Sequence, residues 1–454
     1  MNSKRIISGL LALSLVFGGA LMPNGALKNI ASVSASAETV KYGDFICDVL
    51  DDGTAEISRY MGSDSEVEIP AEIEGATVTG IGAGAFSGCQ TLVNVIIPDN
   101  VNSIGSAAFM SCTKLESITL SANVETISDA TFNGCSALKT IEIPDSVVSV
   151  GSVVFNGCVS LESVVLSNSL ETISDAAFIG CSALKEIVIP DSVTSIGDSV
   201  FSYCTNLENV TLSKGLQSMG STAFACCDSL NSVTMPDGIT ALGDYTFANC
   251  IKLESIVLPD SMESIGKSSF SGCTNLNEVN LPEGLALIGE TAFRDCVTLK
   301  SVVIPASVTS IGENAFAEYD KTEKSFKPLG NLTLSCYTNS AAHKYASQNN
   351  LKFELLDAAK PAYPKNIKVD YSEEYHQIRF TWDKVENAQQ YGIAVYLAGK
   401  WRIQTQKIPY STVSYTTPKN LTPGKTYKVA IAAKVDGKWD TSNAIKNAVT
   451  VTVK

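Results

Sequence analysis

The chain has 454 residues, with 33 Lys and Arg against 47 Asp and Glu, which gives a formal net charge of −14. Nucleic-acid binding requires a basic face that replaces counterions, so this acidic balance excludes it as the main function. The length exceeds that of one ordinary domain and predicts a repeat array or several domains.

Residues 1–37 have the pattern of a secretory signal peptide. Two basic residues precede an apolar run from Ile6 to Met22, and the segment ends in Ala35-Ser36-Ala37. A membrane anchor is the alternative, but the small residues at the end favour cleavage. No later stretch reaches the roughly 18 apolar residues that a membrane span needs. We therefore expect an exported chain that starts near Glu38 and is secreted or held at the cell surface.

A period of 23 residues organises the middle of the chain. Every unit carries a phenylalanine, and in ten units a cysteine and a leucine follow it three and six residues later. The phenylalanines are Phe86, Phe109, Phe132, Phe155, Phe178, Phe201, Phe224, Phe247, Phe270, Phe293 and Phe316. A fixed period is typical of a solenoid. We expect repeats over residues 81–318, an N-terminal cap over 38–80 and a C-terminal cap over 319–357.

Each unit also contains a short alternating segment, such as Ile141-Glu142-Ile143. In a strand, this alternation points the two isoleucines inward and Glu142 outward. One strand per unit, with the next about 4.8 Å away, builds a continuous parallel sheet. Residues at the same phase then stack as ladders in the core. The expected fold is therefore mainly β, a solenoid with a parallel sheet.

The units alternate in pairs. The twelfth position after the phenylalanine is proline in one unit and serine in the next, and after the third serine only proline occurs. The three serines are Ser121, Ser167 and Ser213. Glu116, Lys139, Glu162, Lys185 and Glu208 fall at one phase of neighbouring units. Opposite charges on adjacent strands contribute about 0.2–1 kcal/mol each, so we expect this row to stabilise the array.

The unit F-x-x-C-x-x-L-x-x-[VI]-x-[IL]-P-x-x-[VL]-x-x-[IL]-G resembles the BspA-like leucine-rich repeat of bacterial surface proteins. The resemblance covers about 42–357, with Asn339 and Ser340 at the start of a cap helix. It departs from the pattern at Tyr319, where the cysteine is absent and an insertion begins. The resemblance implies secreted or surface proteins that act in adhesion and in protein or glycan binding, and it brings no catalytic residues.

Ten of the 13 cysteines occupy one phase of the period, from Cys89 to Cys296. Neighbouring Cβ atoms about 4.8 Å apart are too distant for a disulfide, which requires about 3.8 Å. We therefore expect buried free thiols that serve as small apolar core residues. Cys47, Cys226 and Cys336 lie off this phase, and a bridge from Cys47 to Cys336 would have to span the whole array.

Residues 358–362 form an expected linker, and 363–454 form an expected β-sandwich. The expected strands are 377–382, 390–397, 411–416, 426–435 and 448–453. The segments FTWDKVENAQQYGIAVY and LTPGKTYKVAIAAK resemble a fibronectin type III domain, with Trp382 in its core and a turn from Leu421 to Tyr427. This resemblance implies a spacer or adhesion module.

Charge is unevenly distributed between the two parts. Residues 38–362 hold 16 Lys and Arg against 40 Asp and Glu, a net of −24, whereas 363–454 hold 14 against 7, a net of +7. The basic part suits an anionic polymer, and a solvated lysine-rich surface is the alternative. Trp401 and Trp439 each follow Gly-Lys and are candidates for an aromatic platform that binds glycan. Alternatively, both rings pack on the sheet.

The outward strand positions form the candidate binding face of the solenoid. They are Ile96, Thr119, Glu142, Val165, Val188, Thr211, Thr234, Val257, Asn280 and Val303. Apolar side chains that alternation points to solvent suggest a contact stripe. The alternative is β-propensity, which favours valine, isoleucine and threonine in any strand. Of these positions we select the eight apolar and threonine residues as the candidate site.

No catalytic, cofactor or metal site is expected. The chain has no C-x-x-C motif, and its two histidines, His343 and His376, lack the partners of a nucleophile–base pair. We therefore expect a non-enzymatic adhesion or binding scaffold that engages a protein or glycan on a host, plant or bacterial surface. The alternatives are a carbohydrate-binding accessory that acts through the C-terminal sandwich and a purely structural envelope component. The oligomeric state stays open.

Overall fold

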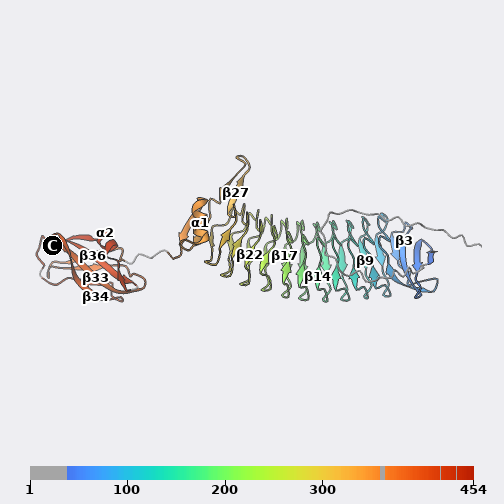
Figure 1. Cartoon of the computed structure of the whole chain (residues 1–454), viewed down its shortest axis with the longest axis horizontal. Helices are drawn as coiled ribbons and strands as arrows, with labels where there is room; N and C mark the ends of the chain where they lie inside the picture. The colour runs from blue at the N-terminus through green and yellow to red at the C-terminus, as the bar shows by residue number, and fades with distance from the viewer. Residues whose placement is uncertain (1–37, 358–362, 420, 436) are drawn as a thin grey trace, which may run out of the picture.

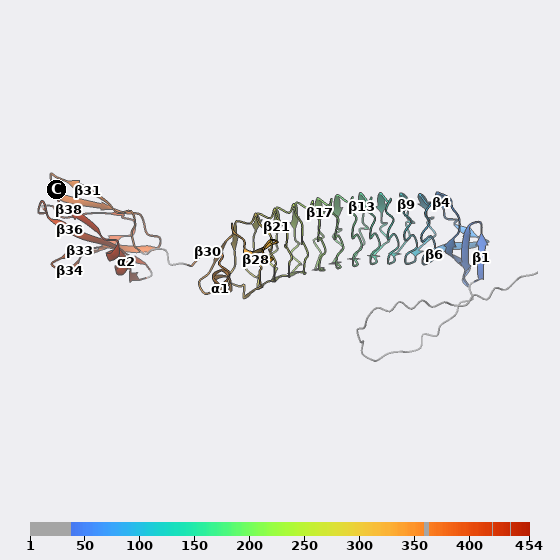
Figure 2. The ribbon, with the colours of Figure 1, turned by 90° about the horizontal axis from the view of Figure 1, so that it is seen from above.

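The computed structural model describes residues 38–357, 363–419, 421–435 and 437–454. The predicted signal peptide (1–37) and linker (358–362) lie outside the described residues. Residues 38–357 form a solenoid of stacked turns (Figure 1 and Figure 2). One continuous apolar core runs from Cys47 to Leu351, and a second core lies within residues 367–453. The fold is mainly β, as predicted.

The first strand of each repeat is the strand that the alternating pattern predicted. These strands are β4 (Glu66–Glu68), β7 (Asn94–Ile96), β9 (Ser117–Thr119), β11 (Thr140–Glu142), β13 (Ser163–Val165), β15 (Glu186–Val188), β17 (Asn209–Thr211), β19 (Ser232–Thr234), β21 (Ser255–Val257), β23 (Glu278–Val279), β25 (Ser301–Val303), β29 (Thr333–Cys336) and β30 (Lys352–Leu355). All their pairings are parallel. The prediction of one continuous sheet is wrong, because the ladder breaks into five pieces.

The five pieces of the first-strand ladder are separated by four breaks. Three of these breaks follow the pairwise alternation of the units. They come after β9, β13 and β17, the strands of the repeats that carry serine in place of proline. In five of the proline repeats, the amide of the residue before proline bonds to the next strand, as Ile143 does with the Val165 carbonyl at 2.9 Å. In a serine repeat the hydroxyl bonds instead to the preceding repeat, and Ser167 Oγ donates to the Val147 carbonyl at 2.6 Å. The fourth break, after β23, falls in a proline repeat.

A second strand in each repeat was not predicted. These strands are β8 (Ser103–Ile104), β10 (Thr126–Ile127), β12 (Ser149–Val150), β14 (Thr172–Ile173), β16 (Ser195–Ile196), β18 (Ser218–Met219), β20 (Ala241–Leu242), β22 (Ser264–Ile265), β24 (Leu287–Ile288) and β26 (Ser310–Ile311). They form two parallel ladders, β8 to β18 and β20 to β26. The turns that carry the phenylalanines also bond from repeat to repeat, as Phe201 N does to the Ala223 carbonyl at 2.8 Å. Each turn of the solenoid is therefore held to the next along three walls.

The eleven phenylalanines form one stacked column in the core, as predicted. Each is fully buried, and neighbouring ring centroids lie 4.9–5.7 Å apart. Tyr60 stacks on the first ring and Tyr345 packs edge-on against the last. The two caps therefore close the column with tyrosines, whose hydroxyls can reach polar partners at the ends.

Each cap covers one end of the core. At the N-terminus, β1 (Glu38–Tyr42), β2 (Phe45–Val49), β3 (Thr54–Tyr60), β5 (Glu72–Ile73) and β6 (Ala76–Ile81) extend the second-strand sheet. At the C-terminus lie the hairpin β27 (Ala317–Asp320) and β28 (Ser325–Pro328) and helix α1 (Ala341–Gln348). The hairpin stands out from the stacked turns (Figure 1). Ser340 caps α1 by accepting from the His343 amide, as predicted.

The C-terminal domain consists of two antiparallel sheets. One contains β31 (Lys368–Ser372), β32 (Gln377–Thr381) and β35 (Ser414–Thr416). The other contains β33 (Ala388–Leu397), β34 (Lys400–Pro409), β36 (Thr426–Val435), β37 (Lys438–Trp439) and β38 (Val449–Thr452), with helix α2 (Thr441–Lys446) before β38. All five predicted strands are present, but β31, β34, β37 and α2 were not predicted. Trp382 is buried in this core, as predicted.

Candidate binding surface

The first strands place one residue of each repeat on the outer surface. Within β13, the central Val164 packs against the core, and Val165 points outward. The parallel register brings equivalent residues side by side: Val165 lies opposite Glu142, and Val188 opposite Thr211. Because the strands stack in register, the outward residues form a column that runs along the array.

All eight predicted face residues are exposed. They are Ile96, Thr119, Val165, Val188, Thr211, Thr234, Val257 and Val303. The exposed fractions of Val165, Val188 and Val257 are 55, 62 and 58 %, so the sheet holds these apolar side chains in solvent. We name the run Val165, Val188, Thr211, Thr234 and Val257 the central stripe. Along it, no charged side chain interrupts the apolar and methyl-bearing column.

Carboxylates border the central stripe at both ends of its strands. The exposed ones are Glu162, Glu186, Glu208 and Glu254 at the start of the strands and Asp191, Asp237 and Asp260 beyond their ends, and Lys185 and Lys214 are the exposed lysines of the same borders. Lys214 lies 3.6 Å from Asp191, and its backbone amide and charge lower the pKa of that carboxyl. The central stripe is therefore an apolar strip with acidic borders.

The predicted row of alternating charges forms only in part. Lys139 Nζ lies 2.6 Å from Glu116 Oε2, and this contact raises the pKa of the lysine. Among the residues of this row, which all lie in the described part, no other pair reaches ion-pair distance. Exposed pairs contribute little to stability, so the row is mainly a solvated surface.

Shallow concavities occur at both ends of the first-strand face. One of about 480 Å³ includes Thr119, Leu120, Glu142 and Pro144. Another of about 490 Å³ includes Glu254, Asn277, Lys300 and Asn331. Both are open and polar at the rim, so they fit contacts to a macromolecular surface better than an enclosed small molecule.

Trp401 and Trp439, the candidate glycan platform, line one groove of about 250 Å³ on the C-terminal domain. Both rings are half-buried. The Trp401 ring lies 5.4 Å from that of Tyr396, and Trp439 lies across Gly392, where an added Cβ would come within 3.1 Å of the indole. The structure thus brings both tryptophans together, although each also packs on the sheet as the alternative proposed.

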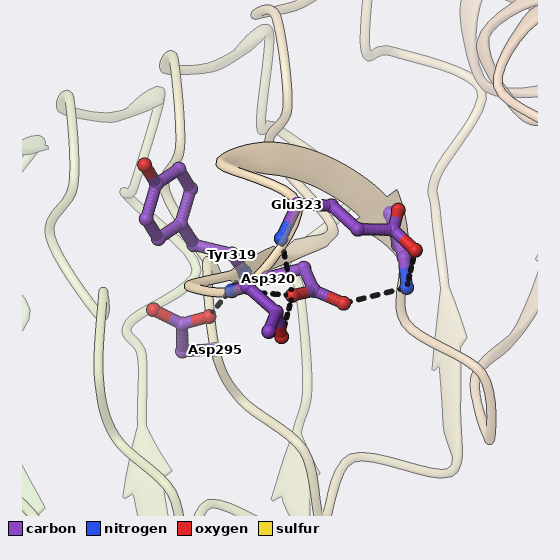
Figure 3. A network of polar contacts seen from close by, with 6 residues as sticks. Asp295, Tyr319, Asp320 and Glu323 are labelled. Atoms are coloured by element: carbon purple, nitrogen blue, oxygen red, sulfur yellow. Dashed lines mark hydrogen bonds and ion pairs between the residues drawn. The ribbon is translucent and has the colours of Figure 1, made fainter.

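The protruding hairpin carries a polar network that sequence reasoning missed (Figure 3). Asp320 Oδ1 accepts hydrogen bonds from the amides of Thr322 and Glu323, and Lys327 Nζ lies 2.6 Å from Asp320 Oδ2. These contacts lower the pKa of Asp320. The network stabilises the turn, and the Asp320-Lys321-Thr322 sequence after a strand is the local signal that could have revealed it.

The cysteine ladder has an unpredicted polar function. From Cys112 to Cys296, each thiol donates to the carbonyl of the phenylalanine 26 residues earlier, at 3.1–3.3 Å. These nine cysteines are fully buried, as predicted. Burial raises the pKa of the eight from Cys135 to Cys296, for example that of Cys135 to about 12, and the contact with Cys89, followed by burial, raises that of Cys112. A thiol therefore fills a small core position and also provides a donor to a carbonyl, which an alanine would not.

Cys89, at the N-terminal end of the ladder, differs from the rest. It is half-buried and lines an open concavity of about 670 Å³ with Arg59 and Gln90. The Cys112 thiol and the Arg59 charge favour its thiolate and lower the pKa of Cys89. The prediction that all ten ladder cysteines are buried alike is wrong at this position, because no preceding repeat covers it.

We predict that Cys89 is the fastest ladder cysteine to be alkylated in the folded protein. The thiolate is the nucleophile, so a lowered pKa and partial exposure both increase its rate near pH 7. Brief treatment with iodoacetamide followed by peptide mass mapping measures this, with Cys204 as the buried control. Cys112→Ala should slow the reaction, because the Cys112 S–H, once turned away from the Phe86 carbonyl, is the donor to the Cys89 thiolate. Equal modification of Cys89 and Cys204 would contradict the prediction.

Two further observations concern the described residues as a whole. Within them, no group of three or more His, Cys, Asp and Glu side chains is placed to hold a metal ion. None of their helices has the length and apolar character that crossing a membrane requires.

Comparison with known proteins agrees with the repeat pattern. The sequence model of the BspA type leucine rich repeat region matches six copies, over residues 64–185, 125–254 and 240–350. No curated protein matches the chain.

Several solved structures are similar to the solenoid. A leucine rich repeat protein of T. pallidum is 34 % identical over 42 % of this chain and 91 % of its own, with a TM-score of 0.41. A leucine rich cell surface protein of Faecalibacterium prausnitzii is 29 % identical over 69 % of this chain and 98 % of its own, with a TM-score of 0.42. A leucine-rich repeat protein of Bacteroides ovatus is 27 % identical over 70 % and 99 %, with a TM-score of 0.42.

Proposed function

Because this chain belongs to the BspA type leucine rich repeat family, we propose that it is a non-enzymatic adhesion or binding scaffold of the cell exterior. The central stripe is the single observation that carries the proposal. Three valines more than half exposed on a hydrogen-bonded sheet form a surface that is apolar, flat and already ordered. A partner that covers it gains apolar burial, and the protein loses little conformational entropy.

The partner is proposed to be a protein or glycan on a host, plant or bacterial surface. The proposed export through residues 1–37 would bring the solenoid to such partners. Residues 363–454, proposed as a fibronectin type III-like module, would then act as a spacer or second adhesion module. The family supports these assignments, because its repeats build extended binding surfaces along a solenoid.

The test replaces Val165, Val188 and Val257 with aspartate in the full mature chain. We expect binding to immobilised mucin, plant polysaccharide or an extracellular-matrix protein preparation to fall at least tenfold. Burying three carboxylates against an apolar contact costs several kcal/mol. Surface plasmon resonance on each immobilised probe measures the change.

The matched control is Val148→Asp, an exposed valine outside the central stripe. It adds one negative charge to the solenoid, as each of the three substitutions does, and should leave binding unchanged. If the wild type binds one of these probes and the triple variant binds it equally well, the assignment of the central stripe is refuted.

A carbohydrate-binding accessory is the second candidate, because Trp401 and Trp439 line one groove. Under this alternative, replacing both tryptophans with alanine abolishes binding to polysaccharide, and the triple aspartate variant does not. The groove lining provides only three polar side chains, Thr405, Gln406 and Thr441. A sugar requires several hydrogen bonds around the stacking ring, so the composition of the groove favours a more apolar partner.

A further inference from the structure

The outer face of the five-stranded sheet in the C-terminal domain is unusually small and apolar. Along β36, Val429, Ile431 and Ala433 point into the domain core, so the alternate residues face outward. These are Lys428, Ala430, Ala432 and Lys434. On the neighbouring strand, Gly392 and Ala394 face the same way and line the groove with the two alanines. The floor therefore lacks large side chains.

Larger apolar side chains stand around this floor. Trp401 and Ile403 rise from β34, Trp439 from β37 and Ile445 from α2. The exposed fraction of Ile403 is 63 %, and that of Tyr396, which packs against Trp401, is 43 %. A recess with a small-residue floor and exposed apolar walls has the shape that accepts a protruding apolar side chain.

Lysines lie at both ends of the same face. Lys428 is directly opposite Tyr396, and Lys434 is directly opposite Trp439, so both project on the groove side of the sheet. Asp440, between β37 and α2, caps α2 by accepting from the Asn443 amide. The domain as a whole carries a net charge of +7. The groove is therefore apolar in the middle and basic at its ends.

The central stripe of the solenoid is complementary in both respects. It presents apolar side chains between rows of exposed carboxylates, on a part of the chain with a net charge of −24. The stripe spans four strand steps from Val165 to Val257, about 19 Å, and Lys428 and Lys434 lie six residues apart on one strand, about 20 Å. The two surfaces therefore match in charge, polarity and size.

We propose that the groove of the C-terminal domain binds the central stripe of a second copy of this chain. The contact would join the head of one molecule to the tail of another, because the two surfaces are different. Each pair would retain one free groove on one chain and one free stripe on the other, so association would continue into open strings. The proposal does not rest on the proposed function, since a second copy and not a foreign partner occupies the stripe.

The linker alone does not reach the centre of the stripe in the same chain. Val188 on β15 lies seven first-strand steps from β30, the last strand of the solenoid, which is about 34 Å. The five residues 358–362 span at most about 18 Å when fully extended. The centre of the stripe is therefore distant from the tether of its own C-terminal domain.

Sedimentation velocity of the mature full-length chain tests the proposal. We expect the weight-average sedimentation coefficient to increase with protein concentration at low salt. The association constant should fall about tenfold at high salt, because the opposed charges on the two surfaces are screened. Compaction that is independent of concentration, or a monomer at every concentration, would overturn the proposal.

Two single variants and their mixture make the test specific. Ile403→Glu blocks the groove and Val188→Asp blocks the stripe, and both sites are more than 60 % exposed, so folding is retained. Each variant alone should stay monomeric. Their mixture should form a one-to-one dimer, because the first variant keeps its stripe and the second keeps its groove.

Matched controls are Tyr371→Glu in the other sheet and Val148→Asp outside the stripe, and both should associate as the wild type does. A mixture that stays monomeric would overturn the head-to-tail arrangement. Full association by either blocking variant alone would overturn it as well. Ile403→Glu leaves the central stripe intact and uncovered, so this variant should still bind mucin, polysaccharide or matrix protein, and failure of this proposal and failure of the proposed function are distinguishable.

Discussion

Replacing Phe201 with alanine should lower the free energy of unfolding of the solenoid by about 3–5 kcal/mol. Phe201 is fully buried, and its ring stacks between Phe178 and Phe224 at 5.4 and 5.3 Å. The substitution removes apolar burial and two aromatic contacts, each worth about 0.5–1.5 kcal/mol. The repeats on either side are held by backbone hydrogen bonds and cannot collapse to fill the cavity.

The positions of the tryptophans allow unfolding of the solenoid to be measured separately from unfolding of the C-terminal domain. All three tryptophans, Trp382, Trp401 and Trp439, lie in the C-terminal domain, whereas most of the β-structure lies in the solenoid. In urea unfolding, the far-ultraviolet circular dichroism transition of Phe201→Ala should move to lower urea. The tryptophan fluorescence transition should stay in place, because the two hydrophobic cores share no residue.

Tyr203→Ala is the matched control, two residues away and 57 % exposed. It should change the free energy of unfolding by no more than about 0.5 kcal/mol. Because repeat arrays lose stability locally, Phe201→Ala should also broaden the dichroism transition or divide it in two. A loss below about 1 kcal/mol would show that the phenylalanine column does not support the fold.

The sequence predicted the parts of the fold that recur at one phase. The period located the phenylalanine column, the buried thiols and the outward positions of the first strands. Ile141-Glu142-Ile143 alternates, and the structure places Glu142 outside as expected. These predictions follow from burial alone, because each unit must hide the same apolar side chains as its neighbours.

The second strands could not be predicted from burial patterns. Each contains only two residues, such as Thr126–Ile127, so alternation has no length over which to be recognised. The conformation of the turns before the phenylalanines could not be predicted from the sequence either. They hold Val153 and Thr222 at φ of 52° and 56°, in the left-handed region that β-branched residues avoid. Bonds to the next repeat, such as Val153 N to the Asp175 carbonyl at 3.0 Å, hold this conformation.

For the candidate surfaces, too, the sequence predicted one part and not the other. Exposure of Val165 and Val188 followed from strand period and is confirmed. The shared groove of Trp401 and Trp439 did not follow from spacing, because 38 positions separate the two residues along the chain and α2 and β37 were not predicted. Whether either surface binds a partner stays a prediction.

Replacing Gly220 with alanine should destabilise the solenoid by about 3 kcal/mol, the second large effect that we expect. Gly220 belongs to a column nineteen residues after each phenylalanine, where every chain turn crosses close over the one before. An added Cβ at Gly220 would lie 2.5 Å from both Asp198 N and the Gly197 carbonyl carbon. Both atoms are backbone, so no rotamer change can relieve the contact.

The same column provides graded controls. At Gly243 the nearest backbone atoms would lie 3.0 Å from the added carbon, so Gly243→Ala should cost less than Gly220→Ala. Ser174 occupies the equivalent position of a serine repeat and already carries a Cβ, so Ser174→Ala should be nearly neutral. Urea unfolding followed by circular dichroism ranks the three variants. Equal stability of Gly220→Ala and Ser174→Ala would mean that neighbouring turns have room to separate, and the close crossing would then not be what requires glycine.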